Sequence, residues 1–371
     1  MNDDESILSQ FVQASLPGYL VEYLRQIIMK TTGALAVRSS SKLEDSYVQP
    51  FAGVYATYMI AVDSNYAEKS ADQMNMAIKC VYASIFMKAG KSYIAAASNA
   101  TEEEKMGIVI QDVCGQQYGK YFFPAISGIA RSINYYPVAG EKPQQGIAQI
   151  AIGLGKHIVE GGTSLRFSPA HPHKAMQLAS IEDTLRTTQK SFLALHLNLN
   201  QFSPSVNDSI NLAQLQVKDF LEHANLKLLT SAYDYQNQVL RDDFYAPGRR
   251  LVTFNNILIH KKFPLADILV ELLDIGKQEL NSPVEIEFAL DIDKDFQHAT
   301  FSLLQIRPIV DTGAGGLANL QKIDPQNMLV HTNKAPGKRA NKRHRAHSVH
   351  KTRPLQPRKT CTVCYGTGRN K

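Results

Sequence analysis

The chain has 371 residues, of which 44% are hydrophobic, with four cysteines and a formal net charge of +6, and this length allows one large domain or two lobes around a substantial core. No stretch is long and apolar enough to span a membrane, and the acidic start MNDDES is not typical of a signal peptide. The cysteines lack the spacing of a disulfide framework, so we expect a cytoplasmic protein in a reducing compartment.

Helix and strand patterns are interleaved along the first half of the chain. Apolar residues at helical spacing predict a helical segment before Ala36 and a helix over residues 74–85. Apolar or β-rich runs predict strands at residues 35–38, 55–62, 106–113 and 147–154, the last two of them buried.

The second half continues this mixture. We expect helices over residues 181–195, 210–238 and 265–273, and an antiparallel hairpin of residues 284–290 and 301–310 joined by a polar loop. This interleaving predicts an α+β nucleotide-binding domain. It is not a Rossmann domain, because Ile158 stands where the third glycine of that fingerprint would be, and a strict P-loop is also absent.

The predicted hairpin has one polar face. Alternate residues of a strand share a face, so Glu285 and Glu287 point one way on the first strand, and Gln305 and Arg307 share a face on the second. If the apolar faces pack into one core, the polar groups converge and suit Mg²⁺ and a polyphosphate. The alternative is a solvated surface of weak Glu–Arg pairs, and the hairpin alone favours it.

A second polar segment lies far away in the sequence. The strand that ends at Arg38 runs into Ser39, Ser40 and Ser41. Hydroxyls, backbone N–H groups and a guanidinium at such a turn can surround phosphate oxygens. The alternative is an ordinary strand-to-loop transition.

Together these segments resemble the nucleotide-binding N-terminal region of the phosphoenolpyruvate synthase and pyruvate phosphate dikinase family. The matching blocks run in order from Ala36 to Val310: AVRSSSKLEDS, PFAGVYATY, VIQDV, SGIARS, GLGKHIVEGG, VEIEFAL and LLQIRPI. The resemblance implies an ATP-grasp-like fold in which two α+β lobes clamp ATP and Mg²⁺. It also implies phosphoryl transfer from ATP to a histidine on a separate domain, and then to pyruvate on a third.

The resemblance assigns roles to individual positions. Arg38 and Arg307 would hold the triphosphate, and Glu287 and Gln305 would hold Mg²⁺ or the ribose–phosphate side of the nucleotide. Glu285, counted among the nucleotide-binding residues, stands where the family usually has aspartate.

Further positions would border the nucleotide. Gln111 to Val113 would form the strand beside the adenine, and a Ser127–Gly128 turn and Gly153 to Gly155 would line the site. Lys156 replaces a glutamate that many relatives carry, and the resemblance gives it little weight.

The chain also departs from the family. It has no GGK segment before Ala36, no Thr-x-Gly-Gly-type segment with the phosphorylated histidine, and no pyruvate-binding barrel. We therefore predict the ATP- and Mg²⁺-binding domain of a dikinase-like phosphotransferase at residues 1–311, not complete on its own. The alternative is a non-catalytic nucleotide-binding remnant or regulatory module of a truncated gene.

Residues 312–335 are predicted to be a linker, and residues 336–371 a disordered basic tail. Twelve of the 40 Lys and Arg lie from Lys334 onward, where there is no Asp or Glu, so the preceding body has 28 basic and 34 acidic residues. The tail has few large apolar residues with which to offset the ordering entropy.

Three interpretations of the tail stay open. One is a nucleic-acid-binding arm, because clustered Lys and Arg neutralise phosphates. Another is a zinc site, which is less favoured because one CxxCxGxG unit supplies only two of the four ligands that a stable site needs. The favoured hypothesis is a frameshift near Ala335, which fails if neither other reading frame of the gene gives dikinase-like sequence. The candidate zinc ligands are Cys361, Cys364, His347 and His350.

Overall fold

The computed structural model describes residues 3–41, 53–96, 105–138, 140–293 and 298–309, together with three short strands between residues 328 and 365. Contacts divide the chain into two units. The first comprises Met1–Asn134 and Gln144–Ile309, and the second Tyr135–Pro143 and Val310–Lys371. None of the helices within the described ranges combines the length and apolarity that crossing a membrane would require.

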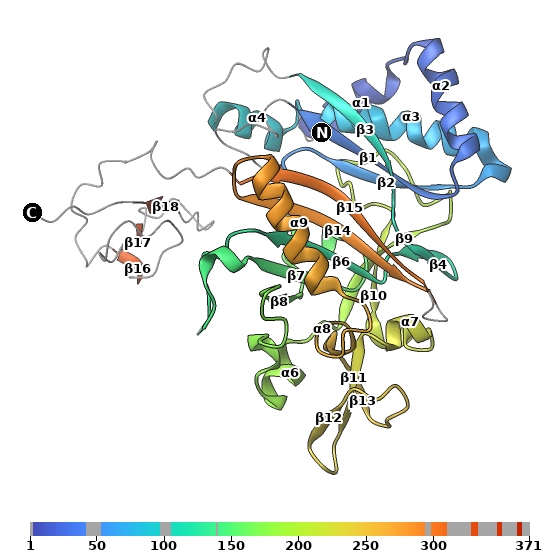
Figure 1. Ribbon diagram of the computed structural model, residues 1–371. Helices are drawn as coiled ribbons and strands as arrows, with labels where there is room; N and C mark the ends of the chain where they lie inside the picture. Colours follow the sequence, from blue (N-terminus) through green and yellow to red (C-terminus); the bar gives the residue numbers. More distant parts are fainter. Residues whose placement is uncertain are drawn as a thin grey trace, which may run out of the picture. The chain divides into compact units, whose positions relative to one another are not determined.

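Helices and a small antiparallel sheet form one side of the first unit (Figure 1). The sheet has the strand order β2-β1-β3, with β1 at its centre. Helix α3 packs along β1 and β2, while α1 and α2 lie against α3. The elements are α1 (Asp3–Gln13), α2 (Gly18–Lys30), α3 (Ala67–Ser84), β1 (Gly33–Ser41), β2 (Thr57–Val62) and β3 (Met106–Asp112).

The alternation of β1 sets the direction of its side chains. Leu35 and Val37 are buried in the same apolar cluster as Met74 of α3. Because successive strand residues point to opposite faces, Ala36 and Arg38 lie on the face turned away from the helices.

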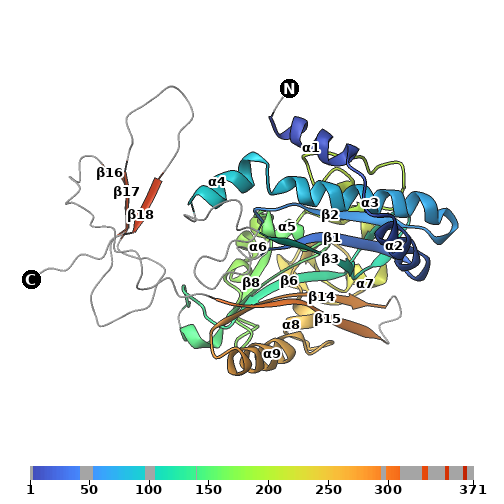
Figure 2. The same ribbon diagram turned by 90° about the horizontal axis from the view of Figure 1, so that it is seen from above.

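A larger sheet lies beneath that face. Its order is β15-β14-β6-β7-β8, with every neighbouring pair antiparallel. Figure 2 shows the succession of layers: helices α1 and α3, the small sheet, the larger sheet, and helix α9. The elements are β6 (Ile126–Arg131), β7 (Ile147–Ala151), β8 (Leu165–Phe167), α9 (Leu265–Glu279), β14 (Val284–Ile292) and β15 (Ala299–Pro308).

Helix α9 covers the apolar face of the β14–β15 hairpin. A Cβ placed on Gly276 of α9 would lie 2.6 Å from Cδ1 of Ile306 and 3.1 Å from Cγ2 of Val284, so helix and strands are in close contact. The hairpin itself is confirmed, with Glu285 opposite Arg307. The polar residues of both strands therefore lie on the face opposite α9.

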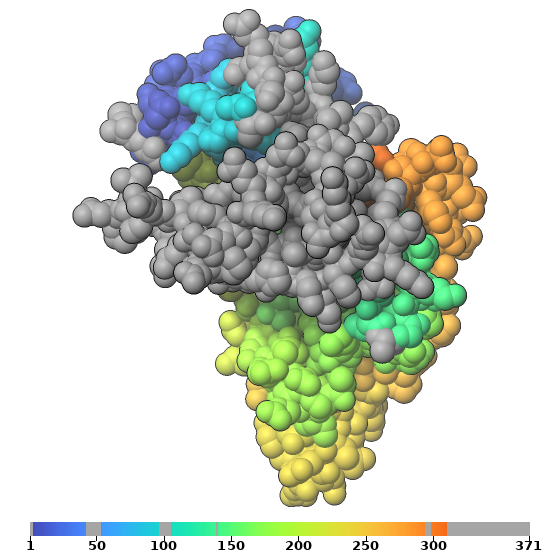
Figure 3. Space-filling model, turned by 90° about the vertical axis from the view of Figure 1, so that its left-hand side faces the viewer, coloured from blue at the N-terminus to red at the C-terminus, as the bar shows by residue number. Residues whose placement is uncertain are grey.

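The remaining elements complete the first unit. The sheet of β11, β12 and β13 lies at the end of the unit farthest from α1 to α3 (Figure 3). A further sheet has the order β10-β9-β5-β4. The elements are α4 (Lys88–Ala96), β4 (Gln116–Tyr118), β5 (Tyr121–Phe123), α5 (Lys156–Val159), α6 (Ile181–Thr187), β9 (Ser191–His196), β10 (Leu212–Gln216), α7 (Ala224–Lys227), β11 (Thr230–Asp234), β12 (Val239–Arg241), β13 (Arg249–Val252) and α8 (Asn255–Leu258).

The α+β class is confirmed, but two predicted helices are wrong. Residues 181–195 form a helix only as far as Thr187 and then enter strand β9. Residues 210–238 contain β10, the short helix α7 and β11 instead of one long helix. A short apolar run is compatible with the period of a helix and with that of a strand. In β9, pairing with β5 and β10 favours the strand.

Two local expectations are also corrected. The strand at residues 106–113 is present as β3, but it is an edge strand with alternating exposure and is not buried. The predicted Ser127–Gly128 turn is part of strand β6, paired on both sides. Edge position and pairing depend on partners that are distant in the sequence, so the local pattern could not supply them.

The second unit contains three short strands that form one antiparallel sheet, β16 (Met328–Thr332), β17 (His347–His350) and β18 (Thr362–Tyr365). Residues 310–327, 333–346, 351–361 and 366–371 lie outside the described residues. Strands β17 and β18 lie within the predicted tail. The disorder of its other residues, the linker, the zinc site and the frameshift stay predictions.

Asp291 of β14 makes stability depend on pH. Burial raises the pKa of Asp291 to about 6, and the negative charge of Asp293 also raises it. The hydrogen bond that the backbone N–H of Ala125 donates to Oδ1 acts in the opposite direction and lowers the pKa. A raised carboxyl pKa contributes stability that is present below about pH 4 and is lost as the pH rises through 6. We expect Asp291→Asn, which keeps the acceptor oxygen, to raise the free energy of unfolding by about 1–3 kcal/mol at pH 7.

Denaturant unfolding at pH 7 and pH 4 measures this effect, and the gain should nearly vanish at pH 4. The exposed Asp274 of α9 is the matched control, for which we expect no gain on replacement by Asn. An equal gain at both pH values would contradict the assignment.

Candidate functional site

Three charged residues lie in a row across the larger sheet. Arg131 of β6, Glu285 of β14 and Arg307 of β15 are direct partners across adjacent strands. Nε of Arg131 donates to Oε2 of Glu285, and Nε and Nη2 of Arg307 both donate to Oε1, the Nε contact at 2.8 Å. The carboxylate of Glu285 is thus held between two guanidinium groups.

The environment of Glu285 fixes its charge. The side chain of Glu285 is only 5% exposed. Burial opposes ionisation, yet the guanidiniums of Arg131 and Arg307 outweigh it and hold the pKa of Glu285 below its ordinary value. The carboxylate is therefore ionised at neutral pH, and the solvated Glu–Arg surface considered from the sequence does not describe this residue.

Arg38 reaches the same polar face from the other sheet. Its Nη2 donates to Oε1 of Gln305 at 2.7 Å, across a sequence separation of 267 residues. Gln305 and Arg307 are two positions apart on β15 and share a face. The structure therefore brings together Arg38, Gln305, Arg307 and Glu285, to which the resemblance assigned roles in nucleotide binding.

Glu287 lies beside this group on β14. It is opposite Gln305 in the β14–β15 pairing, and no hydrogen bond or ion pair engages it within the described ranges. Carboxylate and amide oxygens are suitable ligands for Mg²⁺, which commonly takes one or two protein ligands together with phosphate and water. Glu287 and Gln305 fit such an ion.

Across the part of the chain that the structure describes, no three His, Cys, Asp or Glu side chains are grouped to hold a metal ion.

Gln111 lies where β3 meets the hairpin, and Val113 follows the last residue of β3. Nε2 of Gln111 donates to the backbone carbonyl of Leu304 at 3.4 Å, and the N–H of Val113 donates to Ala34. Leu304 is the extra residue of a bulge in β15, next to Gln305. Gln111 and Arg38 are thus both attached to the same short segment of β15.

The glycine segment after β7 packs against strand β6. Oγ of Ser127 donates to the carbonyl of Gly153 at 2.7 Å, and Gly155 precedes the short helix α5. Gly153 has a φ of +90°, which disfavours any residue with a side chain, and a Cβ added there would lie 2.6 Å from Cδ2 of Phe192.

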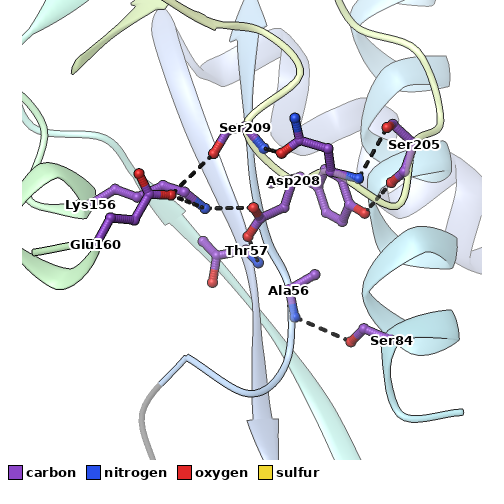
Figure 4. A network of polar contacts seen from close by, with 10 residues as sticks. Ala56, Thr57, Ser84, Lys156, Glu160, Ser205, Asp208 and Ser209 are labelled. Carbon is purple, nitrogen blue, oxygen red and sulfur yellow. Dashed lines mark hydrogen bonds and ion pairs between the residues drawn. The ribbon is translucent and has the colours of Figure 1, made fainter. Parts of the chain in front are cut away.

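Lys156 connects this segment to the smaller sheet, although the sequence assigned it little weight (Figure 4). Its Nζ lies 2.6 Å from Oδ1 of Asp208 and 3.7 Å from Oε1 of Glu160. Oδ2 of Asp208 accepts the backbone N–H of Thr57, the β2 residue paired with Arg38. Asp208 therefore links β2 to the start of α5.

We expect Lys156 and Asp208 to be energetically coupled, because their side chains are only 15% and 25% exposed. In a double-mutant cycle with Lys156→Met and Asp208→Asn, the coupling energy should be about 1–2 kcal/mol, measured by denaturant unfolding. The pair of Arg186 and Asp183 on α6 is the control, since Arg186 is 75% exposed, and its coupling should be below about 0.5 kcal/mol. Equal coupling in both pairs would contradict a structural link.

Sequence reasoning missed two members of this region. Arg131 lies within the SGIARS block, and strand alternation from Ser127 places it on the polar face, but only the pairing with Glu285 shows its contact. Asp208 lies between the helices predicted over residues 181–195 and 210–238, where no element was predicted, and no local pattern indicated its contact with Lys156.

Comparison with known proteins identifies a family to which most of the chain is similar. The family model described as pyruvate phosphate dikinase, AMP/ATP-binding domain, matches residues 1–328. The match covers every element of the first unit and confirms the resemblance found in the sequence. A search of curated proteins found no match.

Proposed function

The chain belongs to the pyruvate phosphate dikinase AMP/ATP-binding domain family, and we propose that it binds ATP with Mg²⁺ as the nucleotide-binding part of a dikinase-like phosphotransferase. The two facing sheets would act as the lobes of an ATP-grasp-like clamp. The reaction proposed is phosphoryl transfer from ATP to a histidine on a separate domain.

One observation carries this proposal. Arg38 of the smaller sheet contacts Gln305 of the larger one, beside Arg307. Two guanidiniums, an amide oxygen and a carboxylate that has no partner among the described residues thus converge from segments at opposite ends of the domain. Such a set matches the charge of a triphosphate and its cation.

Each residue would have a distinct task. Arg38 and Arg307 would hold the phosphates, and Glu287 with Gln305 would hold Mg²⁺, which supplies charge neutralisation when bound. The backbone beside Gln111 and Val113 would border the adenine. Phosphoryl transfer depends chiefly on such positioning and neutralisation.

The contact between Arg38 and Gln305 has a consequence for binding. The amide oxygen that would bind the cation accepts a hydrogen bond from a guanidinium, and two positive groups on one oxygen repel each other. Arg38 would therefore transfer from Gln305 to a phosphate oxygen when the nucleotide binds.

The second candidate is a non-catalytic nucleotide-binding or regulatory module. The residues before β1 form helices α1 and α2 and contain no GGK segment, so the lysine that reaches the phosphates in the family has no counterpart there.

Two experiments test these proposals. Isothermal titration of the full chain with ATP and Mg²⁺ should show binding, and its absence would overturn both candidates. A dikinase histidine domain added in trans with ATP should acquire phosphohistidine under the first candidate. Binding without phosphohistidine would favour the second.

A further inference from the structure

Arg131 stands out among the charged residues of the polar face because no role follows for it from the family resemblance. It lies directly opposite Glu285, which lies directly opposite Arg307. The two arginines contact different oxygens of the same carboxylate. Both guanidiniums are thus held close to one point, on the face that Arg38 also reaches.

The row has an excess of positive charge. Two guanidiniums share one carboxylate, and Glu285 is ionised, so one positive charge is left uncompensated. A guanidinium has five N–H donors, and Arg131 uses only its Nε within the described residues. Its side chain is 50% exposed, compared with 22% for Arg307, so the side chain of Arg131 is the more accessible of the two to an anion.

The position of Arg131 indicates which part of a nucleotide it would meet. Gln111, which would border the adenine, donates a hydrogen bond to the carbonyl of Leu304, three positions before Arg307 on β15. Arg131 lies in the same row as Arg307, on β6, the second strand from β15. At the usual strand spacing, the backbones of β6 and β15 are about 10 Å apart. This is the phosphate side of the proposed site, away from the adenine border.

We propose that Arg131 is a second phosphate-binding arginine, which contacts the terminal phosphates of a nucleoside triphosphate together with Arg307, and that Glu285 positions both guanidiniums. The inference rests on the proposed function, because the anion is the ATP held by Arg38 and Arg307. Arg131 would then let the site distinguish a triphosphate from a monophosphate.

The test is titration of full-length Arg131→Ala with ATP and Mg²⁺, and separately with AMP. We expect the Kd for ATP to rise about tenfold, as for loss of one charge-assisted contact, and the Kd for AMP to change less than about twofold. Arg131→Lys, which keeps the positive charge beside Glu285, should recover part of the loss. Arg186→Ala on α6 is the control and should change neither Kd.

Each other outcome overturns the inference. An unchanged Kd for ATP in Arg131→Ala would exclude contact between Arg131 and the nucleotide. An equal rise of the Kd for ATP and for AMP would mean that Arg131 only neutralises Glu285 and does not contact the terminal phosphates. Failure of the unmodified chain to bind ATP would instead overturn the proposed function itself, and this inference with it.

A second measurement avoids dependence on folding of the variant. Phenylglyoxal modifies accessible guanidiniums, and peptide mass spectrometry can follow Arg131 in the unmodified chain. ATP with Mg²⁺ should slow the modification of Arg131 several-fold, whereas AMP should not. Equal modification rates with and without ATP would contradict the proposal.

Discussion

Replacing Arg307 with alanine is expected to raise the Kd for ATP with Mg²⁺ about 100-fold. In the proposed site Arg307 supplies two or more charge-assisted hydrogen bonds to phosphate, each contributing about 1.5–3 kcal/mol. Two bonds at the lower end of this range give a loss of about 3 kcal/mol, which corresponds to a change on the order of 100-fold. Isothermal titration of the full chain measures it.

The variant should remain folded, because Glu285 keeps Arg131 as an ionic partner. Circular dichroism checks this, and Arg186→Ala, which removes an exposed arginine of α6, should leave the Kd unchanged. A change of less than about threefold in Arg307→Ala, well below one charge-assisted contact, would show that this arginine does not hold the phosphates.

Replacing Gly128 with alanine is expected to lower the free energy of unfolding by about 2–3 kcal/mol. A Cβ at this position would lie 2.2 Å from Cζ of Phe288, the residue opposite it on β14. The ring of Phe288 is 1% exposed and stacks on Phe301 with centroids 5.3 Å apart, so it has no space to turn aside. Denaturant unfolding measures the loss, and the slope with denaturant should not change.

Gly18 provides the matched control for that substitution. It is the first residue of α2, and a Cβ there would meet no atom within 4 Å. Gly18→Ala should be neutral or slightly stabilising, because alanine has the higher helix propensity. Similar losses in both variants would mean that the loss at Gly128 comes from the backbone and not from Phe288.

The polar face of the hairpin could be predicted because strand alternation has a fixed period. Once 284–290 and 301–310 were recognised as strands, Glu285, Glu287, Gln305 and Arg307 had to share a face if the apolar residues packed together. The order of the sequence blocks likewise identified the family.

Other features depend on contacts between distant segments. The strand β9 was predicted as helix because its apolar run is short, and pairing with β5 and β10 decided its conformation. The contact of Arg131 with Glu285 required β6 and β14 to be neighbours, although 154 residues separate them. The contact of Asp208 with Lys156 similarly joins two segments whose local patterns carry no sign of each other.

The sequence by itself determined the family, the α+β class and which residues of each hairpin strand share a face. These properties follow from residue order and from the two-residue period of a strand. Only the tertiary structure decided that Glu285 is shared by two arginines and that Arg38 meets Gln305. Those contacts arise because the strand order within the larger sheet and the stacking of the two sheets bring together residues that no local rule connects.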